Sequence, residues 1–233
     1  AQSANFPFCT IEPNHSIINV PDSRLVNLED IVKPEKVIPA TVEIVDIAGL
    51  VKGASRGEGL GNKFLANIRE TDAIIHVLRC FDNDNVTHVD GSVNPVRDKE
   101  IIDIELQLKD LETLNKRLEK ISRTAKSGNK DAEKEKLALE LAIETINTSK
   151  NIRSTNLDKN SFEKYLKPLQ LITAKPVLYV CNVDEKSIIS SNNHVESVVK
   201  IIQNEGANFI TLAAGIESEI NELDDFEERR VFL

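Results

Sequence analysis

Five short segments of the chain are rich in apolar and β-branched residues, which is the pattern of β-strands. Segments 73–80, 176–182 and 208–214 are nearly continuous apolar runs, as expected for strands buried on both faces of a parallel sheet. Segments 16–20 and 41–49 share the β-branched enrichment, and the second ends in small residues. The pattern therefore predicts five strands, three of them buried and parallel.

Helix-favouring stretches separate these strands along the chain. They cover residues 62–70, 98–149, 162–173 and 194–205. Strands that alternate with helices are typical of a doubly wound α/β sheet with helices on both faces, which gives three layers.

The long charged stretch departs from this alternation. Its first half places apolar residues three or four positions apart, which makes one apolar helix face. Gly128-Asn129 then interrupts the pattern, as a turn between two helices would. The second half alternates with period two, but its Ala, Glu, Leu and Lys content favours a helix over a strand. We predict an antiparallel helical hairpin over residues 95–155, whose first apolar face consists of Ile104, Leu108, Leu111, Leu114, Leu118 and Ile121.

The tip of this predicted hairpin is basic, although the chain as a whole is acidic. The formal net charge of the 233 residues is -9. Residues 116–136, however, contain eight basic and four acidic side chains, a local charge of +4. A positive projection suits contact with a nucleic-acid backbone, where counterion release supplies affinity. The alternative is an ordinary solvated coiled coil of mixed charge. The basic residues are Lys116, Arg117, Lys120, Arg123, Lys126, Lys130, Lys134 and Lys136.

Composition places the chain among ordinary globular proteins of one or two domains. Hydrophobic residues make up 40% and charged residues 29%. The three cysteines, Cys9, Cys80 and Cys181, are too far apart for a CxxC pair, which fits a reducing compartment. No apolar run approaches the roughly 18 residues of a membrane span, and the first residues lack the features of a signal peptide. We expect a cytoplasmic monomer that contacts no membrane.

A first candidate for nucleotide chemistry follows the second predicted strand. Asp46-Ile47-Ala48-Gly49 has the DxxG arrangement of nucleotide switches. The carboxylate of Asp46 can hold Mg²⁺ through water, and the Gly49 amide can approach a γ-phosphate because no Cβ intervenes. Thr10 precedes the first strand at the place of the threonine that ligates Mg²⁺ in such switches. Each of these residues alone could equally be an ordinary loop residue.

A second candidate follows the strand at 176–182. Asn182-Val183-Asp184-Glu185 lies where doubly wound sheets bind ligands, at the carboxyl edge of a strand. It is similar to the NKxD motif with which GTPases recognise guanine, but Val183 replaces Lys and Glu185 replaces Asp. Val183 would offer an apolar face to the purine, and the longer Glu185 side chain weakens the argument for strict guanine recognition. An Asn-rich turn without function is the alternative.

The order of these elements resembles a Ras-like domain, and longer segments resemble one family. The chain resembles the YchF/Obg-like ATPase family over essentially its whole length. The resemblance is carried by the Asn-x-x-Glu motif and by the segments NFPFCTIEPN, VDIAGLVKGASRGEGLGNKFLANIRETDAI and NVTHVDGSVNPVRDKEII. The resemblance implies a Ras-like P-loop domain with a coiled-coil insertion, Mg²⁺ as cofactor, and hydrolysis of ATP in preference to GTP. It also implies association with the ribosome, with the large subunit expected, or with RNA. The base site would comprise Asn182, Val183, Glu185, Ala213 and Ala214.

Two parts of the family pattern are missing from this sequence. A GxxxxGKS or GxxxxGKT loop should precede the first switch. The nearest match, 57–63, has Asn62 in place of the second glycine and Phe64 in place of Ser or Thr, so it is not a P-loop. The family's C-terminal TGS domain is also expected beyond Leu233. We therefore expect a chain truncated at both ends, with an incomplete nucleotide domain at 1–94 and 156–233 that lacks its first strand.

The hydrolytic step has no obvious water-positioning residue. Leu50 follows the DxxG glycine, where Ras-type enzymes place a glutamine, and a hydrocarbon cannot orient water. His88, in the loop after strand 73–80, is the candidate catalytic helper, although it could equally be an ordinary surface histidine. We expect an ATP/GTP hydrolase by resemblance, with weak nucleotide binding by this chain alone. The alternatives are a ribosome- or RNA-binding module without enzymatic activity, or an inactive fragment.

Overall fold

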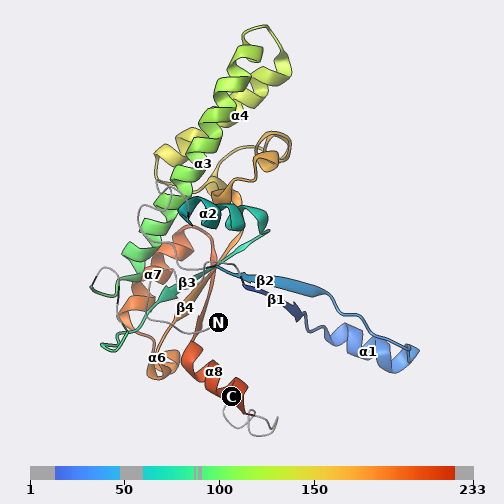
Figure 1. Ribbon diagram of the computed structural model, residues 1–233, viewed down its shortest axis with the longest axis vertical. Helices are drawn as coiled ribbons and strands as arrows, with labels where there is room; N and C mark the ends of the chain where they lie inside the picture. The colour runs from blue at the N-terminus through green and yellow to red at the C-terminus, as the bar shows by residue number, and fades with distance from the viewer. Residues whose placement is uncertain (1–13, 48–59, 87, 89–90, 224–233) are drawn as a thin grey trace. The chain divides into compact units, whose positions relative to one another are not determined.

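The computed structural model of the protein describes residues 14–47, 60–86, 88 and 91–223. The chain divides into two compact units, one within residues 1–49 and one within residues 50–233. The first contains β1, α1 and β2, and the second contains the remaining elements (Figure 1).

The first unit is a two-stranded ribbon with a helix inserted between its strands. β1 (Asn14–Asn19) pairs antiparallel with β2 (Thr41–Asp46), and both match predicted strands. α1 (Ser23–Val32), which the hydrophobic pattern did not predict, begins after Asp22, whose carboxylate caps the helix by accepting from the Arg24 amide at 2.9 Å. Lys33 ends the helix in the left-handed conformation with φ 47°.

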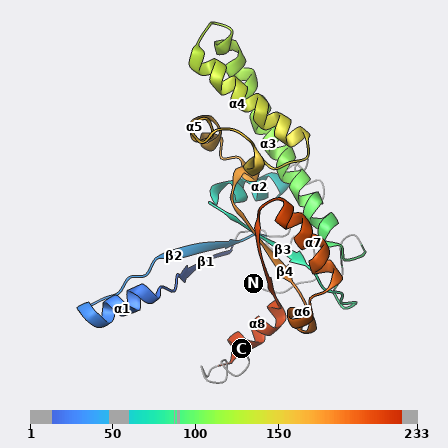
Figure 2. The ribbon, with the colours of Figure 1, turned by 180° about the vertical axis from the view of Figure 1, so that it is seen from behind.

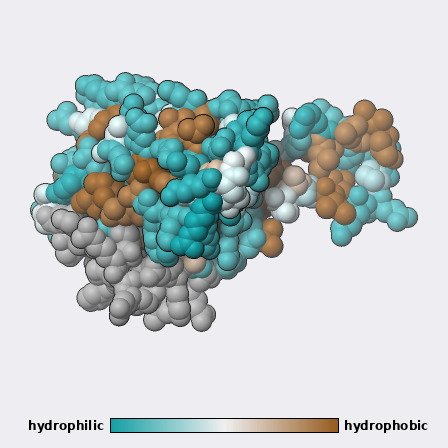
Figure 3. Space-filling view, turned by 90° about the horizontal axis from the view of Figure 1, so that it is seen from above, coloured by the Kyte–Doolittle hydropathy of each residue, from teal (hydrophilic) through white to brown (hydrophobic). Residues whose placement is uncertain are grey.

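Large apolar side chains are exposed on this first unit. No residue of α1 is buried, although half of its residues are apolar. The exposed fraction reaches 78% at Ile31. Hydrophobic residues are visible as brown areas on the protein surface in Figure 3. The exposed apolar residues of this unit include Ile17, Ile18, Val26, Leu28, Ile31, Val32, Ile38 and Val42.

A parallel three-stranded sheet forms the centre of the second unit. Its strands are β3 (Ile74–Arg79), β4 (Val177–Asn182) and β5 (Asn208–Leu212), in the order β3-β4-β5. Both pairs are parallel. The prediction of an α/β fold with parallel strands is thus confirmed, and the observed strands lie within the predicted segments. Burial on both faces is not seen along β3 and β5, since Ile75, Val77 and Ile210 are exposed.

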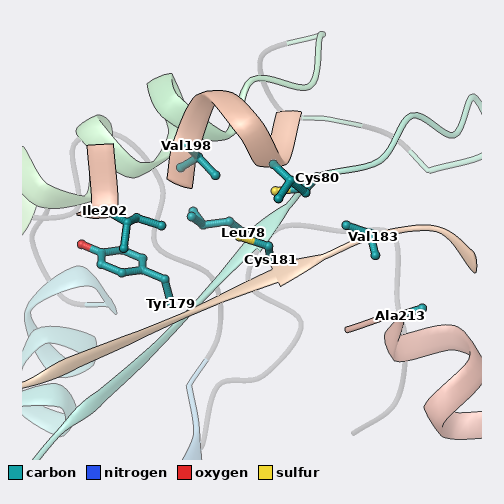
Figure 4. Packing of buried hydrophobic residues seen from close by; sticks show 9 residues of the cluster. Leu78, Cys80, Tyr179, Cys181, Val183, Val198, Ile202 and Ala213 are labelled. Atoms are coloured by element: carbon teal, nitrogen blue, oxygen red, sulfur yellow. The ribbon is translucent and has the colours of Figure 1, made fainter. Parts of the chain in front are cut away.

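One face of this sheet packs against α7 (Asn193–Asn204), which was predicted at 194–205. Leu78 of β3, Cys80 directly after it, and Tyr179 and Cys181 of β4 contribute to the core from the sheet. The facing apolar residues of α7 are Val195, Val198 and Ile202. Figure 4 shows Val198 and Ile202 on the side of α7 that faces the sheet. Near the strand ends the same cluster continues into Val183 and Ala213.

Three helices surround these elements. α2 (Leu60–Glu70) contributes the buried residues Leu65 and Ile68 and matches the predicted helix at 62–70. α6 (Glu185–Ser190) and α8 (Ala214–Glu222) follow β4 and β5, and neither was predicted. Within the described residues no helix has the length and apolar content needed to cross a membrane.

The predicted helical hairpin is confirmed. α3 (Pro95–Ala125) and α4 (Lys130–Asn147) pack along each other, with their connecting turn away from the sheet (Figures 1 and 2). Asn129 caps α4 by accepting from the amides of Asp131 and Ala132 at 3.0 and 3.1 Å. Leu114 and Leu139 are fully buried between the helices, whereas Ile104 is 51% exposed, so the predicted apolar face does not extend to the start of α3.

Residues 151–174 form a series of short helical turns, so the continuous helix predicted at 162–173 is wrong. Pro168 lacks an N–H for a helical hydrogen bond. Gln170 then takes a left-handed conformation, with φ 49°, which ends the helical path. The turns are η1 (Ile152–Ser154), α5 (Lys159–Ser161), the π-helical η2 (Phe162–Leu166), η3 (Lys167–Leu169) and η4 (Ile172–Ala174).

A buried carboxylate holds the last of these turns. Asp110 of α3 is fully buried and accepts from the amides of Ile172 and Thr173 at 2.8 and 2.7 Å. It also accepts from the Thr173 hydroxyl at 2.7 Å. Burial raises the pKa of Asp110, while these hydrogen bonds oppose the rise. The segment that follows α4 is therefore tied back onto α3.

Candidate functional site

The loops that follow β4 and β5 are joined by two hydrogen bonds. The side-chain oxygen Oδ1 of Asn182 accepts from the Ala214 amide at 3.0 Å. The Val183 amide donates to the Leu212 carbonyl at 2.9 Å. Val183 and Ala213 are 4% and 2% exposed, so the apolar part of this junction is packed rather than solvated (Figure 4).

The two acidic residues of the loop have different environments. Asp184 caps α6, because its carboxylate accepts from the Ser187 amide at 2.9 Å. Hydrogen bonds from Ser187 hold the pKa of Asp184 below its ordinary value. Glu185 is the first residue of α6, is exposed, and makes no hydrogen bond to any described residue. Glu185 is therefore the carboxylate of this loop that is available to a ligand.

The structure brings together all five residues predicted for the base site. Asn182 uses its Oδ1 within the protein, which leaves its Nδ2 as a donor, and Glu185 supplies an acceptor. A donor and a carboxylate at one sheet edge suit the mixed acceptors and donors along the edge of a purine. That these residues bind a base stays a prediction.

Sequence reasoning missed a residue that holds this loop. Asn192 bonds through its side chain to the Cys80 carbonyl and to the Ser187 hydroxyl. It also caps α7 by accepting from the Val195 amide at 3.0 Å. The only signal in the sequence was an asparagine just before a predicted helix, which indicates a cap but not the two longer-range bonds.

The switch residues lie in the first unit or outside the described residues. Asp46 ends β2, and its carboxylate is exposed and makes no hydrogen bond to a described residue. Thr10 and Gly49, the other two predicted phosphate and Mg²⁺ contacts, lie outside the described residues, as does Leu50. Their proposed roles stay predictions.

His88 lies in the loop before α3 and is held by an acidic residue of the first turn of that helix. Its Nε2 is 3.0 Å from Oδ2 of Asp98, and the His88 side chain is 17% exposed. The guanidinium of Arg97 donates to the other oxygen of Asp98 at 3.0 Å. His88 is therefore fixed in a small polar cluster with Asp98 and Arg97. A catalytic role for His88 stays a prediction.

The described residues contain no group of three or more His, Cys, Asp or Glu side chains arranged to hold a metal ion. The predicted Mg²⁺ contacts of Thr10 and Asp46 stay predictions.

Part of the positive charge at the hairpin tip is neutralised within the hairpin. Nε of Arg117 is 2.5 Å from Oε1 of Glu135, and three further basic residues pair with glutamates. Four lysines are exposed and make no ion pair with any described residue: Lys120, Lys126, Lys130 and Lys134. These four, with Arg123, which is 84% exposed, define the basic tip.

A buried ionic cluster binds the root of the hairpin to the sheet. Lys99 of α3 is 2% exposed, and its Nζ lies 2.7 Å from Asp103 and also donates to Glu205, just beyond α7. The same Nζ lies 5.4 Å from the centre of the Tyr179 ring on β4. Arg153 completes the cluster, at 3.4 Å from Glu205 and 3.2 Å from the Tyr179 hydroxyl. We call these five residues the root cluster.

Comparisons with known proteins agree on one group of relatives. A family model described as "50S ribosome-binding GTPase" matches residues 1–116. The chain is 48% identical to "Ribosome-binding ATPase YchF" of Pasteurella multocida over 97% of the chain and 62% of that protein. It is also 48% identical to the protein of the same name from Bacillus subtilis, over 100% of the chain and 64% of that protein.

A solved structure of a yeast relative has the same fold. The YchF GTPase of Schizosaccharomyces pombe matches with a TM-score of 0.79 and 35% identity, over 97% of this chain and 62% of that one. The chain thus spans a little under two thirds of the length of these relatives.

Proposed function

Because the chain belongs to the YchF family, we propose that it forms the base-binding and ribosome-contacting part of a ribosome-associated nucleotidase. This protein binds and hydrolyses ATP, with GTP as a poorer substrate, and acts in the cytoplasm. The names of its relatives support the ribosome and ATP, while the family model and the yeast structure are described as GTPases. The preference between the two bases is therefore the property to test.

One observation supports the assignment most strongly. Asn182 is oriented by its bond to the Ala214 amide, and Glu185 is exposed at the start of α6 on the next turn of the same loop. The Asn182 side chain and the backbone of the loop up to Glu185 are placed by hydrogen bonds and a buried Val183, before any ligand binds. Preorganised polar groups of this kind lose little entropy on binding and so favour recognition.

The phosphates and Mg²⁺ would be bound by the switch residues. Asp46 would hold the cation through water, and Thr10 and Gly49 would contact the cation and the γ-phosphate. When bound, Mg²⁺ would neutralise charge on the phosphates during transfer. His88 would assist in placing the attacking water, either directly or through the cluster that it forms with Asp98.

Nucleotide recognition can be tested on the chain by chemical-shift titration of the isotope-labelled protein with Mg²⁺-ATP and Mg²⁺-GTP, which detects millimolar binding. We expect the amides of Val183 and Ala214 to shift, and ATP to bind more tightly. Glu185→Gln should remove most of the discrimination. Asp184→Asn is the matched control, because it removes the same charge one residue away and an amide oxygen can still cap α6. Equal effects of the two variants would contradict base recognition by Glu185.

We also propose that the basic tip contacts ribosomal RNA, with the large subunit as the partner. The supporting observation is the set of four exposed lysines without ion-pair partners among the described residues. Lysines in this state retain their full charge for phosphate contacts, and the resulting affinity should fall steeply with salt.

Co-sedimentation with ribosomes over a range of salt concentrations tests this contact. Replacing Lys120, Arg123 and Lys126 by glutamine should weaken association and reduce the slope of log affinity against log salt by about 2. The control triple variant replaces three other exposed lysines that make no ion pair with a described residue: Lys150, Lys159 and Lys200. If both triple variants weaken association equally, the tip has no special role. If the chain binds neither ribosomes nor nucleotide, it is an inactive fragment.

A further inference from the structure

The loop proposed to bind the base is enclosed by a hydrogen-bond network that centres on one side chain. Asn192 is the residue before α7, and its side chain makes three hydrogen bonds. Its Nδ2 donates to the Cys80 carbonyl at 2.8 Å and to the Ser187 hydroxyl at 3.0 Å. Its Oδ1 accepts from the Val195 amide at 3.0 Å.

The orientation of this side-chain amide follows from its partners. A carbonyl can only accept and a backbone amide can only donate, so the nitrogen must face Cys80 and the oxygen must face Val195. Each polar atom of the Asn192 side chain is therefore used in a way that few other residues could reproduce. Aspartate would keep the acceptor for the Val195 amide but lose both donated bonds. Serine would keep the helix cap, but its side chain is too short to contact Cys80 and Ser187.

Through its first partner, Asn192 reaches the beginning of the loop. Cys80 follows β3, and its amide donates to the Asn182 carbonyl at 2.8 Å. The peptide groups on either side of Cys80 thus connect Asn192 to Asn182 by two hydrogen bonds in series. Cys80 is fully buried, so this link is shielded from water (Figure 4).

Through its second partner, Asn192 reaches the end of the loop. Ser187 is 7% exposed, and its amide donates to the Asp184 carboxylate that caps α6. Glu185 lies in the same first turn of α6. The two ends of the loop are therefore joined through the side chain of Asn192, which lies outside the loop, directly before α7.

The backbone before Asn192 is in an unfavourable conformation. Ser191 has φ 58° and ψ 178°, a backbone conformation that residues other than glycine rarely adopt. Such a conformation is energetically unfavourable and persists where the surroundings require it. Here it directs the chain out of α6 so that Asn192 can face Cys80 and Ser187.

We propose that Asn192 is a positioning residue that holds Glu185 in register with Asn182 and thereby sets the preference of this loop between adenine and guanine. The inference rests on the proposed function, since it concerns the selectivity of the same site. Asn192 itself is not proposed to touch the nucleotide. Removing the side-chain amide of Asn192 should therefore change the ratio of the ATP and GTP affinities while the fold is retained.

The test uses Asn192→Ser in the chemical-shift titration with Mg²⁺-ATP and Mg²⁺-GTP. Serine is as good a helix cap as asparagine, so α7 should be retained, while both bonds donated by the amide are lost. We expect the ratio of the GTP to the ATP dissociation constant to fall about fivefold. Hydrogen exchange of the amides in 185–190 should also become faster, because the first turn of α6 loses its anchor.

Two further variants make the result specific. Asn193→Ser is the matched control, since Asn193 is exposed, is adjacent, and its side chain makes no hydrogen bond to a described residue. Ser187→Ala removes only one of the two bonds that Asn192 donates, together with the bond of the Ser187 hydroxyl to Asp184, and should lower the ratio even if Asn192→Ser fails to fold.

The outcomes separate the two proposals. If wild type prefers ATP and neither Asn192→Ser nor Ser187→Ala changes the ratio, the inference is overturned and the proposed function stands. Equal binding of the two nucleotides by wild type also overturns it. If neither nucleotide shifts any amide of the wild-type chain, the proposed function itself fails, and positioning for a base fails with it.

Discussion

Replacing Lys99 by methionine should destabilise the second unit, because Lys99 is the buried cation of the root cluster. Burial alone would lower the pKa of Lys99, but the charge and hydrogen bond of Asp103 and the bond to Glu205 outweigh it, and the pKa is raised. The folded protein therefore favours the charged lysine. Methionine keeps most of the side-chain volume while it removes the charge and both hydrogen bonds.

The size of the effect follows from what remains after the substitution. Removing one partner of a fully buried ion pair costs about 3–5 kcal/mol, because the other charge is left uncompensated. Here the remaining carboxylates are partly hydrated, since Asp103 is 14% and Glu205 is 29% exposed. Glu205 also keeps Arg153 at 3.4 Å. We therefore expect Lys99→Met to lower the free energy of unfolding by about 2–4 kcal/mol.

Urea unfolding followed by circular dichroism suits this measurement, since the chain has no tryptophan for fluorescence and the helices of the second unit dominate the signal. The control is Lys116→Met on the same helix, where the side chain is 71% exposed and pairs with Glu112. An exposed pair of this kind contributes at most about 1 kcal/mol. A loss for Lys99→Met no larger than that for Lys116→Met would refute the reasoning.

A double substitution tests whether the loss comes from the uncompensated carboxylate. Asp103→Asn removes the charge that Lys99→Met leaves without its partner. If that charge is the cause, the double variant should be more stable than the sum of the single effects predicts, by about 1 kcal/mol or more. Strict additivity would mean that lost packing of the lysine stem, and not charge, explains the destabilisation.

Three smaller predictions follow from other buried or capping groups. Burial lowers the pKa of His76 to about 4, so the unfolded chain binds more protons and stability is lost as the pH falls from about 6.5 towards 4; His76→Phe should flatten this fall in the urea midpoint, and an unchanged pH profile would contradict it. Asp110→Ala leaves the amides of Ile172 and Thr173 without an acceptor and should cost about 2–4 kcal/mol in urea unfolding, whereas Asp110→Asn should cost less because its amide oxygen still accepts. Asn129→Ala should cost about 1 kcal/mol through loss of the α4 cap, measured as a lower thermal midpoint, and no change would mean that the turn is held by other contacts.

The elements that were predicted correctly are those whose signal is local. Continuous apolar runs identified β3, β4 and β5, because apolar and β-branched residues favour a strand wherever a short run of them is bounded by turn residues. Gly128-Asn129 identified the turn of the hairpin for an equally local reason, since Gly128 has φ 82° and Asn129 caps the next helix. The period-two pattern of α4 was interpreted correctly only because its composition favoured a helix.

The errors arise where contacts distant in sequence decide the conformation. Residues 162–173 carry an apolar helical pattern, but Pro168 and the bonds from Asp110 to the following turn break it into short pieces. Ile104 fits the apolar face of α3, yet near the root of the hairpin the packed positions are taken by the polar root cluster. Such buried ion pairs have no signature in hydrophobic periodicity.

The same distinction explains the candidate site. Asn182 and Glu185 were found because the motif is contiguous and follows a strand. Asn192 was missed because its partner Cys80 is 112 residues away in the sequence. Pairing within the hairpin was also not predictable from the charge count. Of the eight basic residues at the tip, four form ion pairs with glutamates, and four lysines form none with a described residue.

The two parts of the proposed function differ in physical character, and salt should separate them. The loop proposed to bind the base, residues 182–185, is organised by hydrogen bonds between neutral groups and by a buried Val183, and salt screens such contacts little. The basic tip acts through exposed charges, whose attraction to phosphate depends strongly on salt. Discrimination between ATP and GTP should therefore persist at salt concentrations that abolish ribosome association. The root cluster is connected to both parts, since Lys99 and Asp103 belong to α3 of the hairpin and Tyr179 belongs to the same strand, β4, as Asn182. Lys99→Met is consequently the substitution by which communication between tip and loop can be measured, because it leaves the sequence of the loop unaltered. A change in nucleotide affinity would mean that β4 transmits strain from the hairpin to the loop. Unchanged affinity would mean that the two parts act independently.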